Sequence, residues 1–197
     1  MRHITYRFLF ILILLVAAHT GQAQNTLSQM NQLRVKTNQS GMLALGAWSV
    51  GNILVGVNRF DKQTENQYFY RMNMYWNIVN LGIATSGYLN AIGESFENLT
   101  DEEKIKKQQK IEKLLLINSG LDIAYMMGGL YLQERGRNQE SRRLRGFGKS
   151  LIMQGGFLLL FDGILYLKHT SNRKKYGKYE IIPAATGNGV GLIFRLR

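Results

Sequence analysis

The sequence predicts a mostly α-helical protein, namely a four-helix transmembrane bundle with a cleaved signal peptide before it and a short C-terminal β-hairpin-like element after it. Three observations lead to this prediction. Four long, largely apolar segments follow a shorter apolar run at the N-terminus. The only proline, Pro183, lies beyond all of them, so no segment contains this helix breaker. The connections between the segments are polar or charged.

Composition excludes several classes of protein. The chain has 197 residues, a formal net charge of +12 and no cysteine. Its length suits a single domain. Without cysteine there is no disulfide scaffold, no thiol nucleophile, no Cys-ligated zinc and no lipoprotein anchor cysteine.

The N-terminus has the organisation of a secretory signal peptide. Basic residues in 1–7 precede the apolar run 8–18, and small residues follow at Gly21 and Ala23. We expect cleavage after Ala23. The alternative is an uncleaved anchor, but the run falls short of the ~18–20 residues that span a bilayer. Cleavage would leave His169 as the only histidine.

The four apolar segments are 41–58, 71–91, 113–132 and 150–168. Each has the length of a spanning helix, about 18–20 residues, with few or no charges. The second segment is marginal because it contains four asparagines, namely Asn73, Asn77, Asn80 and Asn90. The alternative is an exported water-soluble bundle in which these segments are the buried helices.

The segments divide the chain into four regions. We expect a signal peptide at 1–23, an amphipathic lead-in at 24–40, a four-helix membrane domain at 41–168, and a basic tail with a β element at 169–197. Thr100 and Glu103 have the spacing of a capping box, which predicts a helix start before the third segment.

Two aspartates are the only acids within the four segments, and no basic residue lies deep enough within a segment to pair with them. We expect Asp122 and Asp162 at similar depth, with Asn80 and Asn118 nearby, as a candidate intramembrane polar site. Two interpretations stay open. The pair shares a proton or holds a cation, or these groups make interhelical hydrogen bonds that fix the register of the helices.

The third segment has two predicted packing faces and one predicted lipid face. One packing face consists of Asn118, Asp122, Tyr125 and Gly129, and small residues form the other. The small residues Gly120, Ala124 and Gly128 recur every four positions, which lets a neighbouring helix approach closely. The lipid face then consists of Leu116, Ile123, Met127 and Leu130.

Basic clusters flank the last segment. We expect Arg142, Arg143 and Arg145 before it, and Lys174 and Lys175 after it, to contact anionic lipid headgroups rather than nucleic acid, because no nucleic-acid-binding motif accompanies them. The positive-inside rule places the arginine-rich loop in the cytoplasm, whereas the basic tail contradicts that orientation. No nucleophile–base pair or metal-ligand set is visible, and His169 is expected in the basic tail, so we expect neither an enzyme nor a metal or cofactor site.

Two stretches carry a resemblance to a known kind of protein. They are Asn25-Thr-Leu-Ser-Gln-Met-Asn-Gln-Leu-Arg-Val-Lys and Gln154-Gly-Gly-Phe-Leu-Leu-Leu-Phe-Asp-Gly, together with the glycine-rich C-terminal end. With them the chain resembles an uncharacterised family of small exported membrane proteins from the Bacteroidota. The resemblance implies a bacterial envelope setting and no particular activity.

These observations support three functional hypotheses. The leading one is a non-enzymatic integral envelope protein with a structural or partner-binding role, in the inner membrane, as a homo-oligomer or with another envelope protein. The second is a small proton- or cation-handling membrane protein that uses Asp122 and Asp162. The third is an exported soluble bundle that binds an apolar ligand, in the periplasm or associated with the outer membrane.

Overall fold

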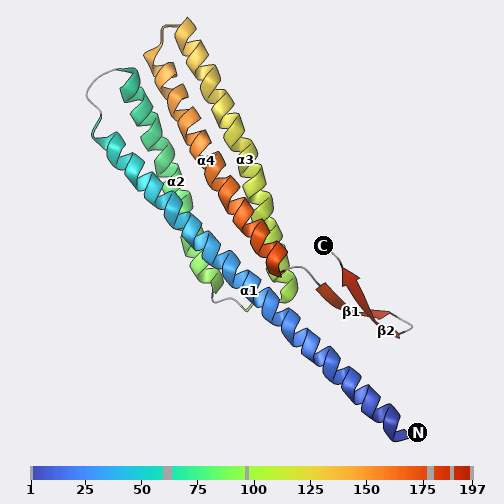
Figure 1. Ribbon diagram of the computed structural model, residues 1–197. Coiled ribbons are helices and arrows are strands. Elements are labelled where there is room, and N and C mark those ends of the chain that lie inside the picture. Colours follow the sequence, from blue (N-terminus) through green and yellow to red (C-terminus); the bar gives the residue numbers. More distant parts are fainter. Residues whose placement is uncertain (1, 60–63, 96–97, 177–179, 187–188, 196–197) are drawn as a thin grey trace.

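The computed structural model contains four long helices and two short strands (Figure 1). The helices are α1 (Arg2–Val57), α2 (Glu65–Ser95), α3 (Asp101–Asn138) and α4 (Arg142–Tyr176). The protein is therefore mostly α-helical, as predicted. The backbone is described for residues 2–59, 64–95, 98–176, 180–186 and 189–195, and the side chains for 27–59, 64–95 and 98–174.

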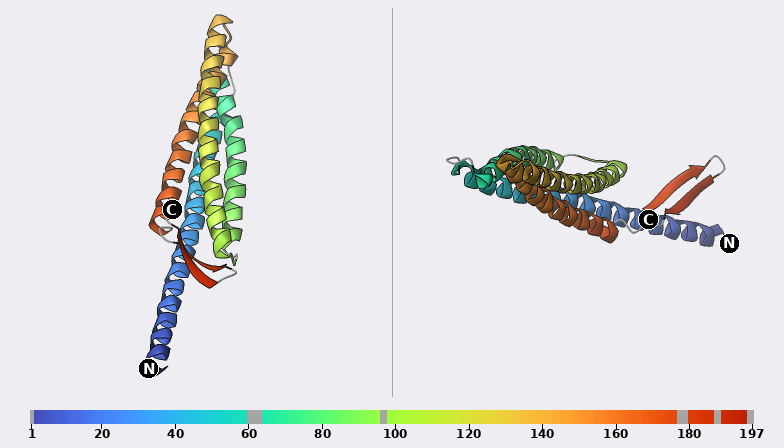
Figure 2. Two further views of the ribbon diagram at one scale, coloured as in Figure 1. Left: turned by 90° about the vertical axis from the view of Figure 1, so that its right-hand side faces the viewer. Right: turned by 90° about the horizontal axis from the view of Figure 1, so that it is seen from above.

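Consecutive helices run antiparallel and form a bundle (Figures 1 and 2). The connections α1–α2 and α3–α4 lie together at one end, which we call the upper end. The connection α2–α3 lies at the opposite, lower end (Figure 1). Helix α1 continues without a break through the predicted lead-in 24–40, and its N-terminal part extends beyond the other helices at the lower end (Figure 2).

Beyond α4 lie the two strands, β1 (Glu180–Thr186) and β2 (Gly189–Arg195). They pair antiparallel, with Glu180 opposite Arg195 and Thr186 opposite Gly189. Each strand of a two-stranded sheet is an edge strand. Pro183, which has no backbone N–H to donate, is therefore tolerated in β1, because no second strand needs a hydrogen bond from it. The side chains of this element lie outside the described residues.

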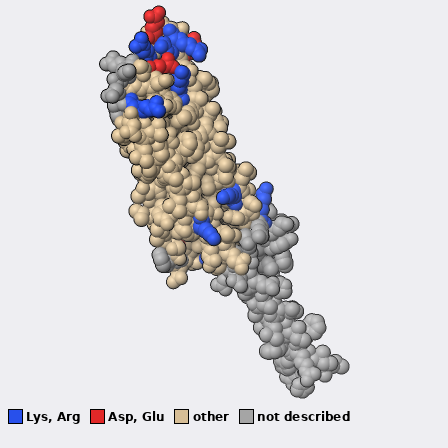
Figure 3. Space-filling model, turned by 60° about the vertical axis from the view of Figure 1, so that its left-hand side comes forward, with Lys and Arg blue, Asp and Glu red and all other residues tan. Residues whose placement is uncertain are grey.

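Polar and apolar side chains are distributed in the reverse of the usual order. The fully buried set contains mostly polar residues, among them Asn73, Asn77, Gln154 and His169. The exposed set contains many large apolar residues, from Leu43 on α1 to Leu167 on α4. In the face shown in Figure 3, charged side chains gather at the upper end, an uncharged surface extends below them, and a few Lys or Arg side chains lie toward the lower end. The bundle thus presents an apolar exterior around a polar interior.

Three helices are long and apolar enough to cross a membrane by length and composition, not the four that the segments predicted. They are the helical stretches Leu27–Val57, Asp101–Asn138 and Arg142–Lys174. Helix α2 is long enough, but its asparagines make it too polar to be counted with the other three. Three of these asparagines, Asn73, Asn77 and Asn80, are buried, whereas Ile78, Val79 and Ile83 on the same helix are exposed.

Each helix nevertheless has a stretch of similar length that contains no lysine, arginine or glutamate, and we call these the uncharged stretches although two of them contain an aspartate. These stretches are 37–58, 72–93, 114–133 and 150–167, and the only charged residues in them are Asp122 and Asp162. At 1.5 Å per residue they are about 27–33 Å long. The hydrocarbon core of a bilayer is about 30 Å thick, so α2 matches its neighbours in length although it differs from them in composition.

The predicted packing face of α3 with Asp122 and Gly129 is confirmed at these two buried residues, although Asn118 and Tyr125 on it are exposed. The predicted small-residue face is wrong for contacts within this bundle. A Cβ atom added at Gly120 or Gly128 would meet nothing within 4 Å. Instead Gly129 faces α4, because a Cβ there would lie 2.7 Å from the carbonyl oxygen of Gly148. A Cβ on Gly148 would in turn lie 2.5 Å from the carbonyl oxygen of Gly129. The two helices therefore approach at a contact of backbone on backbone that only glycine permits.

The predicted capping box at the start of α3 is confirmed. The Glu103 backbone N–H donates to the Thr100 hydroxyl at 3.4 Å, and the Thr100 backbone N–H donates to the Glu103 carboxylate at 2.8 Å. The helix begins twelve residues before the predicted apolar segment at 113, so its first three turns carry the charged linker.

The glycine contact generates a matched pair of predictions. Gly148→Ala forces the α3 and α4 backbones apart, and we expect it to lower the free energy of unfolding by about 1–3 kcal/mol. Gly156→Ala lies on the same helix in open space and should leave the protein as stable or stabilise it by about 0.5–1 kcal/mol. Unfolding in mixed micelles with increasing dodecyl sulfate measures both. Equal effects of the two substitutions would contradict the assigned contact.

Candidate functional site

An amide network joins three helices in the upper half of the bundle. The Asn73 amide on α2 donates to the Asn52 side-chain oxygen on α1 at 2.7 Å. The Gln154 amide on α4 donates to the Asn73 side-chain oxygen. The Trp48 indole N–H on α1 donates to the Gln154 oxygen at 3.3 Å. Four side chains thus satisfy one another where the surrounding surface is apolar and offers no partner.

An aromatic pair holds this network in place. Trp48 stacks on Phe157 of α4, with ring centroids 3.9 Å apart and planes within 6° of parallel. Stacking fixes the indole so that its N–H meets Gln154, three residues before Phe157 on the same helix. Asn77, one turn after Asn73, donates to the Asn73 carbonyl at 2.7 Å, and its own side-chain oxygen has no partner among the described residues.

The two predicted aspartates are both buried, but they are not at the same depth. A Cβ on Gly155 would lie 2.8 Å from the Asp122 carbonyl oxygen, so Gly155 is the α4 residue opposite Asp122. Asp162 follows seven residues later, roughly 10 Å nearer the lower end at 1.5 Å per residue. The two carboxyl groups are still close enough to interact electrostatically. They form a staggered pair rather than two carboxyl groups in contact.

Of the two predicted asparagines, Asn118 lies beside the lower member of this pair and Asn80 lies at a similar level of the bundle. Asn118 on α3 is within hydrogen-bonding reach of Asp162, but its side chain is exposed at the edge of the bundle rather than interior as expected. Asn80 is buried on α2. Helices α2 and α4 run in the same direction and meet where Asn73 contacts Gln154. Asn80 lies seven residues after Asn73, and Asp162 lies eight residues after Gln154. Asn80 and Asp162 are therefore at nearly the same level of the bundle.

Among the described residues, one oxygen of Asp122 and the amide nitrogen of Asn80 are buried without a hydrogen-bond partner. Below Asp162, the next buried side chain on α4 is Leu165, which is 6% exposed and packs on Gly41 of α1, and we call this apolar contact the leucine layer. Leu165 lies three residues after Asp162 on α4 and four before His169. The leucine layer therefore separates the aspartates from the lower end of the interior.

The placement of His169 in a solvated basic tail is wrong. Helix α4 continues to Tyr176, and the His169 side chain is fully buried. Neither ring nitrogen has a hydrogen-bond partner among the described residues. The nearby Gln108 amide on α3 donates to the His169 carbonyl at 3.0 Å and to the Glu112 carboxylate at 2.9 Å. Arg173, one turn beyond His169, donates to both oxygens of Glu112 at 3.0 Å.

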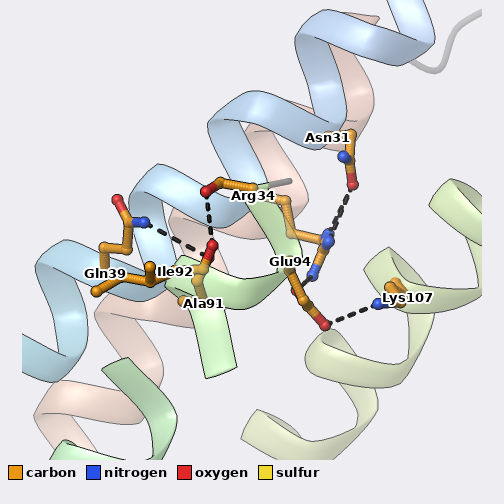
Figure 4. Close-up of polar contacts among 8 residues, drawn as sticks. Asn31, Arg34, Gln39, Ala91, Ile92, Glu94 and Lys107 are labelled. Atoms are coloured by element: carbon orange, nitrogen blue, oxygen red, sulfur yellow. Dashed lines mark hydrogen bonds and ion pairs between the residues drawn. The ribbon is translucent and has the colours of Figure 1, made fainter. Parts of the chain in front are cut away.

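A charged network closes the lower end (Figure 4). Arg34 on α1 is buried, and its guanidinium contacts the Glu94 carboxylate on α2 at 2.6 Å and the Asn31 side chain at 2.9 Å. Lys107 on α3 contacts the other oxygen of Glu94 at 3.0 Å. Burial would raise the pKa of Glu94, but hydrogen bonds from Arg34 and Lys107 outweigh it and hold that pKa below its ordinary value of 4.5. Three helices are thereby fastened to one carboxylate.

A smaller ion-pair group lies at the upper end. Arg145 and Lys149 on α4 contact Glu65 at the start of α2 at 2.8 and 2.6 Å. Hydrogen bonds from these two groups lower the pKa of the Glu65 carboxyl. Arg145 is therefore engaged within the protein, and of the three predicted headgroup-binding arginines only Arg142 and Arg143 remain exposed. Lys174 is exposed at the lower end, and the Lys175 side chain lies outside the described residues.

Within the described part of the chain, no group of three or more His, Cys, Asp or Glu side chains is placed to hold a metal ion. Among the described residues, the buried polar groups include amides, the carboxylates of Glu112, Asp122 and Asp162, the Arg34 guanidinium and the His169 imidazole. Such groups can bind water, protons or a small cation, and they can fix helix register through hydrogen bonds.

A repeat of seven residues could have revealed the lower part of the interior. Positions 108, 115, 122, 129 and 136 are all buried on α3, and positions 148, 155, 162 and 169 are all buried on α4. Extending the row from Asp162 by seven residues reaches His169, and extending it from Asp122 by two repeats reaches Gln108. The buried role of Arg34 has no comparable signal in the sequence, because its partner Glu94 lies on another helix.

The fold and this interior define a class: a helical bundle with a polar core and an apolar exterior, three of whose helices are long and apolar enough to cross a membrane. The chain belongs to a family of unknown function, DUF6992, whose model matches residues 44–163. The match begins within α1 and ends just after Asp162, so it covers both aspartates and the amide network. No curated protein and no solved structure matches the chain.

The lower network generates a prediction with a matched control. Glu94→Gln leaves the buried Arg34 without its carboxylate, and we expect it to lower the free energy of unfolding by about 3 kcal/mol. Glu102→Gln removes only an exposed pair with Lys106 and should have almost no effect.

The same network gives a pH dependence. Because the pKa of Glu94 is lowered in the folded state, its contribution to stability is fully present above its ordinary value of 4.5 and is lost as the pH falls below it. Denaturation from pH 7 to pH 3 measures the difference between the wild type and Glu94→Gln. A difference that does not shrink at low pH would contradict the assignment.

Proposed function

We propose that this protein is a non-enzymatic integral membrane protein whose four helices, α2 included, cross the bilayer as one bundle. The single observation that carries the proposal is the reversed distribution of side chains. Large apolar residues such as Leu54, Val79 and Leu160 are each more than half exposed, while Asn73, Asn77 and Gln154 are almost fully buried. In water, both the exposed apolar side chains and the buried polar side chains would cost free energy. In hydrocarbon, both placements are favourable.

The distribution does not favour the alternative of a water-soluble bundle that binds an apolar ligand. Such a protein would bury its aliphatic residues, yet in the uncharged stretches only Leu45, Leu115 and Leu165 are large, aliphatic and fully buried among the described residues. Asn73 on α2 is compatible with a membrane setting, because in the bundle its side chain pairs with Asn52 and Gln154.

Orientation and surroundings are part of the same proposal. With the signal peptide removed, the lower end would face outward and the upper end, with its arginine-rich α3–α4 connection, would face the cytoplasm. The positive-inside rule favours this side for that connection, but Lys and Arg also gather at the lower end, in 104–113 and 168–175. The exposed Arg142 and Arg143 would meet anionic headgroups at the upper end. Arg173 in the basic tail is neutralised by Glu112, which weakens the conflict at the lower end. We place the protein in the inner membrane of a bacterial envelope.

A structural or partner-binding role has support from one face of α3. Gly120, Ala124 and Gly128 lie on the exterior, and a Cβ added at either glycine would meet nothing within 4 Å. Small residues at this spacing let two membrane helices approach closely. This face is where a second copy or another envelope protein would pack.

A charge placed on the exterior of α2 tests the proposal. Val79 is 62% exposed at the middle of the uncharged stretch, so Val79→Lys would put an ammonium group into hydrocarbon at a cost of about 2.5–3.5 kcal/mol. We expect it to reduce the amount recovered in alkaline-washed inner membranes. Ser95→Lys, at the exposed end of α2, is the matched control and should behave as the wild type.

Two results would contradict the proposal. Release of the wild type by the alkaline wash would show that the helices do not span. Full recovery of Val79→Lys would place α2 in water, since a surface lysine on a soluble bundle is harmless.

A further inference from the structure

Polar side chains follow one line through the interior from the upper to the lower end. On α4 they are Ser150, Gln154, Asp162 and His169, each at most 6% exposed. From Ser150 to His169 the row is about 28 Å long at 1.5 Å per residue, which is close to the thickness of a hydrocarbon core. Hydrogen bonds that only fix register need a few polar residues and do not need a row of this length.

Unpartnered atoms occur along the whole row. Among the described residues, the buried polar atoms without a hydrogen-bond partner include Ser150 Oγ, Asn77 Oδ1, Asn80 Nδ2, Asp122 Oδ2, Gln108 Oε1 and both ring nitrogens of His169. Each such atom costs about 1–3 kcal/mol if it stays unpaired. Ordered water is the usual partner of such atoms. Their positions at successive levels therefore favour a file of water molecules between the helices.

Titratable groups stand on both sides of the leucine layer. Asp122 and Asp162 lie above it and His169 lies below it. The charged groups near His169 are Arg34 on α1 and Glu112 on α3, with Arg173 on its own helix. The uncharged stretches contain no lysine or arginine that would form a permanent ion pair with either aspartate. Chains of Asp, Glu and His within a membrane are the groups that relay protons.

The leucine layer interrupts the file at one place. Leu165 lies between Asp162 and His169, and it packs on Gly41 of α1, where a Cβ would lie 3.0 Å from its methyl groups. A constriction of aliphatic side chains excludes water and limits conduction without blocking the path permanently.

We propose that the bundle conducts protons across the bilayer along this file, with Asp162 and His169 as the relay groups on either side of the leucine layer. A proton held on a carboxylate oxygen of Asp162 passes to water, crosses the leucine layer when water enters it, and binds one nitrogen of His169. The other nitrogen then releases a proton toward the lower end. The proposal rests on the bilayer-spanning bundle proposed above and adds an activity to it.

Proteoliposomes test the proposal with the full chain. Vesicles of phosphatidylethanolamine and phosphatidylglycerol contain the pH dye pyranine, and a potassium gradient with valinomycin supplies the driving potential. We expect proton influx about ten-fold above that of empty vesicles, and a loss of most of this flux in Asp162→Asn and in His169→Gln. Leu165→Ala should raise the flux about three-fold by opening the constriction. Ser86→Ala, an exposed position on α2, is the control and should conduct as the wild type.

An alkaline wash of the same vesicles separates the two proposals. Protein that stays in the membrane without flux above empty vesicles overturns the conduction pathway and leaves the spanning bundle intact. Protein released by the wash overturns both. Wild-type flux in Asp162→Asn or in His169→Gln would show that protons do not use these groups, and an unchanged or lower flux in Leu165→Ala would overturn the role of the leucine layer.

Discussion

The structure depends on one constraint: polar groups in its interior must find their hydrogen-bond partners inside the bundle. The exterior of each uncharged stretch is apolar, so an amide that turned outward would find no partner there. Asn73 illustrates the consequence, because its single side chain joins Asn52 on α1 and Gln154 on α4 to α2. Helix positions are thereby fixed by hydrogen bonds where a soluble protein would use a core of aliphatic side chains.

Glycine makes this arrangement possible on the other side of the bundle. Helices α3 and α4 meet at Gly129 and Gly148 with their backbones in contact, and Gly155 leaves room for the Asp122 backbone. Because these residues recur every seven positions, the same row that brings the backbones together also aligns Asp122, Asp162 and His169 with the interior. Close packing and a polar interior are therefore two results of one sequence pattern.

Sequence reasoning predicted the helical content, the capping box at Thr100 and the outward face of α3, where Leu116, Ile123, Met127 and Leu130 are each more than half exposed. These features depend on residues close together in the chain. The sequence placed Gly129 correctly on a packing face, but it also assigned Gly120 and Gly128 to one, because spacing alone does not distinguish a small residue in a helix contact from one on the exterior. It placed the aspartates at equal depth because their depth was counted in residues from the predicted ends of the segments. The true depth depends on the register of α3 on α4. It missed His169 and Arg34 because their surroundings come from distant helices.

The ends of the bundle differ from its middle in how charge is handled. Glu65 and Glu94 each form ion pairs with two basic side chains, and these pairs join helices that are remote in the sequence. Such ion pairs lie at the upper and lower ends of the bundle, and the uncharged stretches between them contain no lysine or arginine. This distribution agrees with a bilayer that covers only the middle of the bundle. The family match over 44–163 includes the middle parts of α2 and α3 in full and most of those of α1 and α4.

The central claim is that lipid surrounds the apolar exterior of α2 while its asparagines face inward. A cysteine at Val79, in a chain that has no other cysteine, can carry a nitroxide spin label after reconstitution into vesicles. The account predicts frequent collisions of this label with dissolved oxygen, which concentrates in hydrocarbon, and rare collisions with a water-soluble nickel chelate. Frequent collisions with the nickel chelate at this position would place α2 in water and would contradict the account.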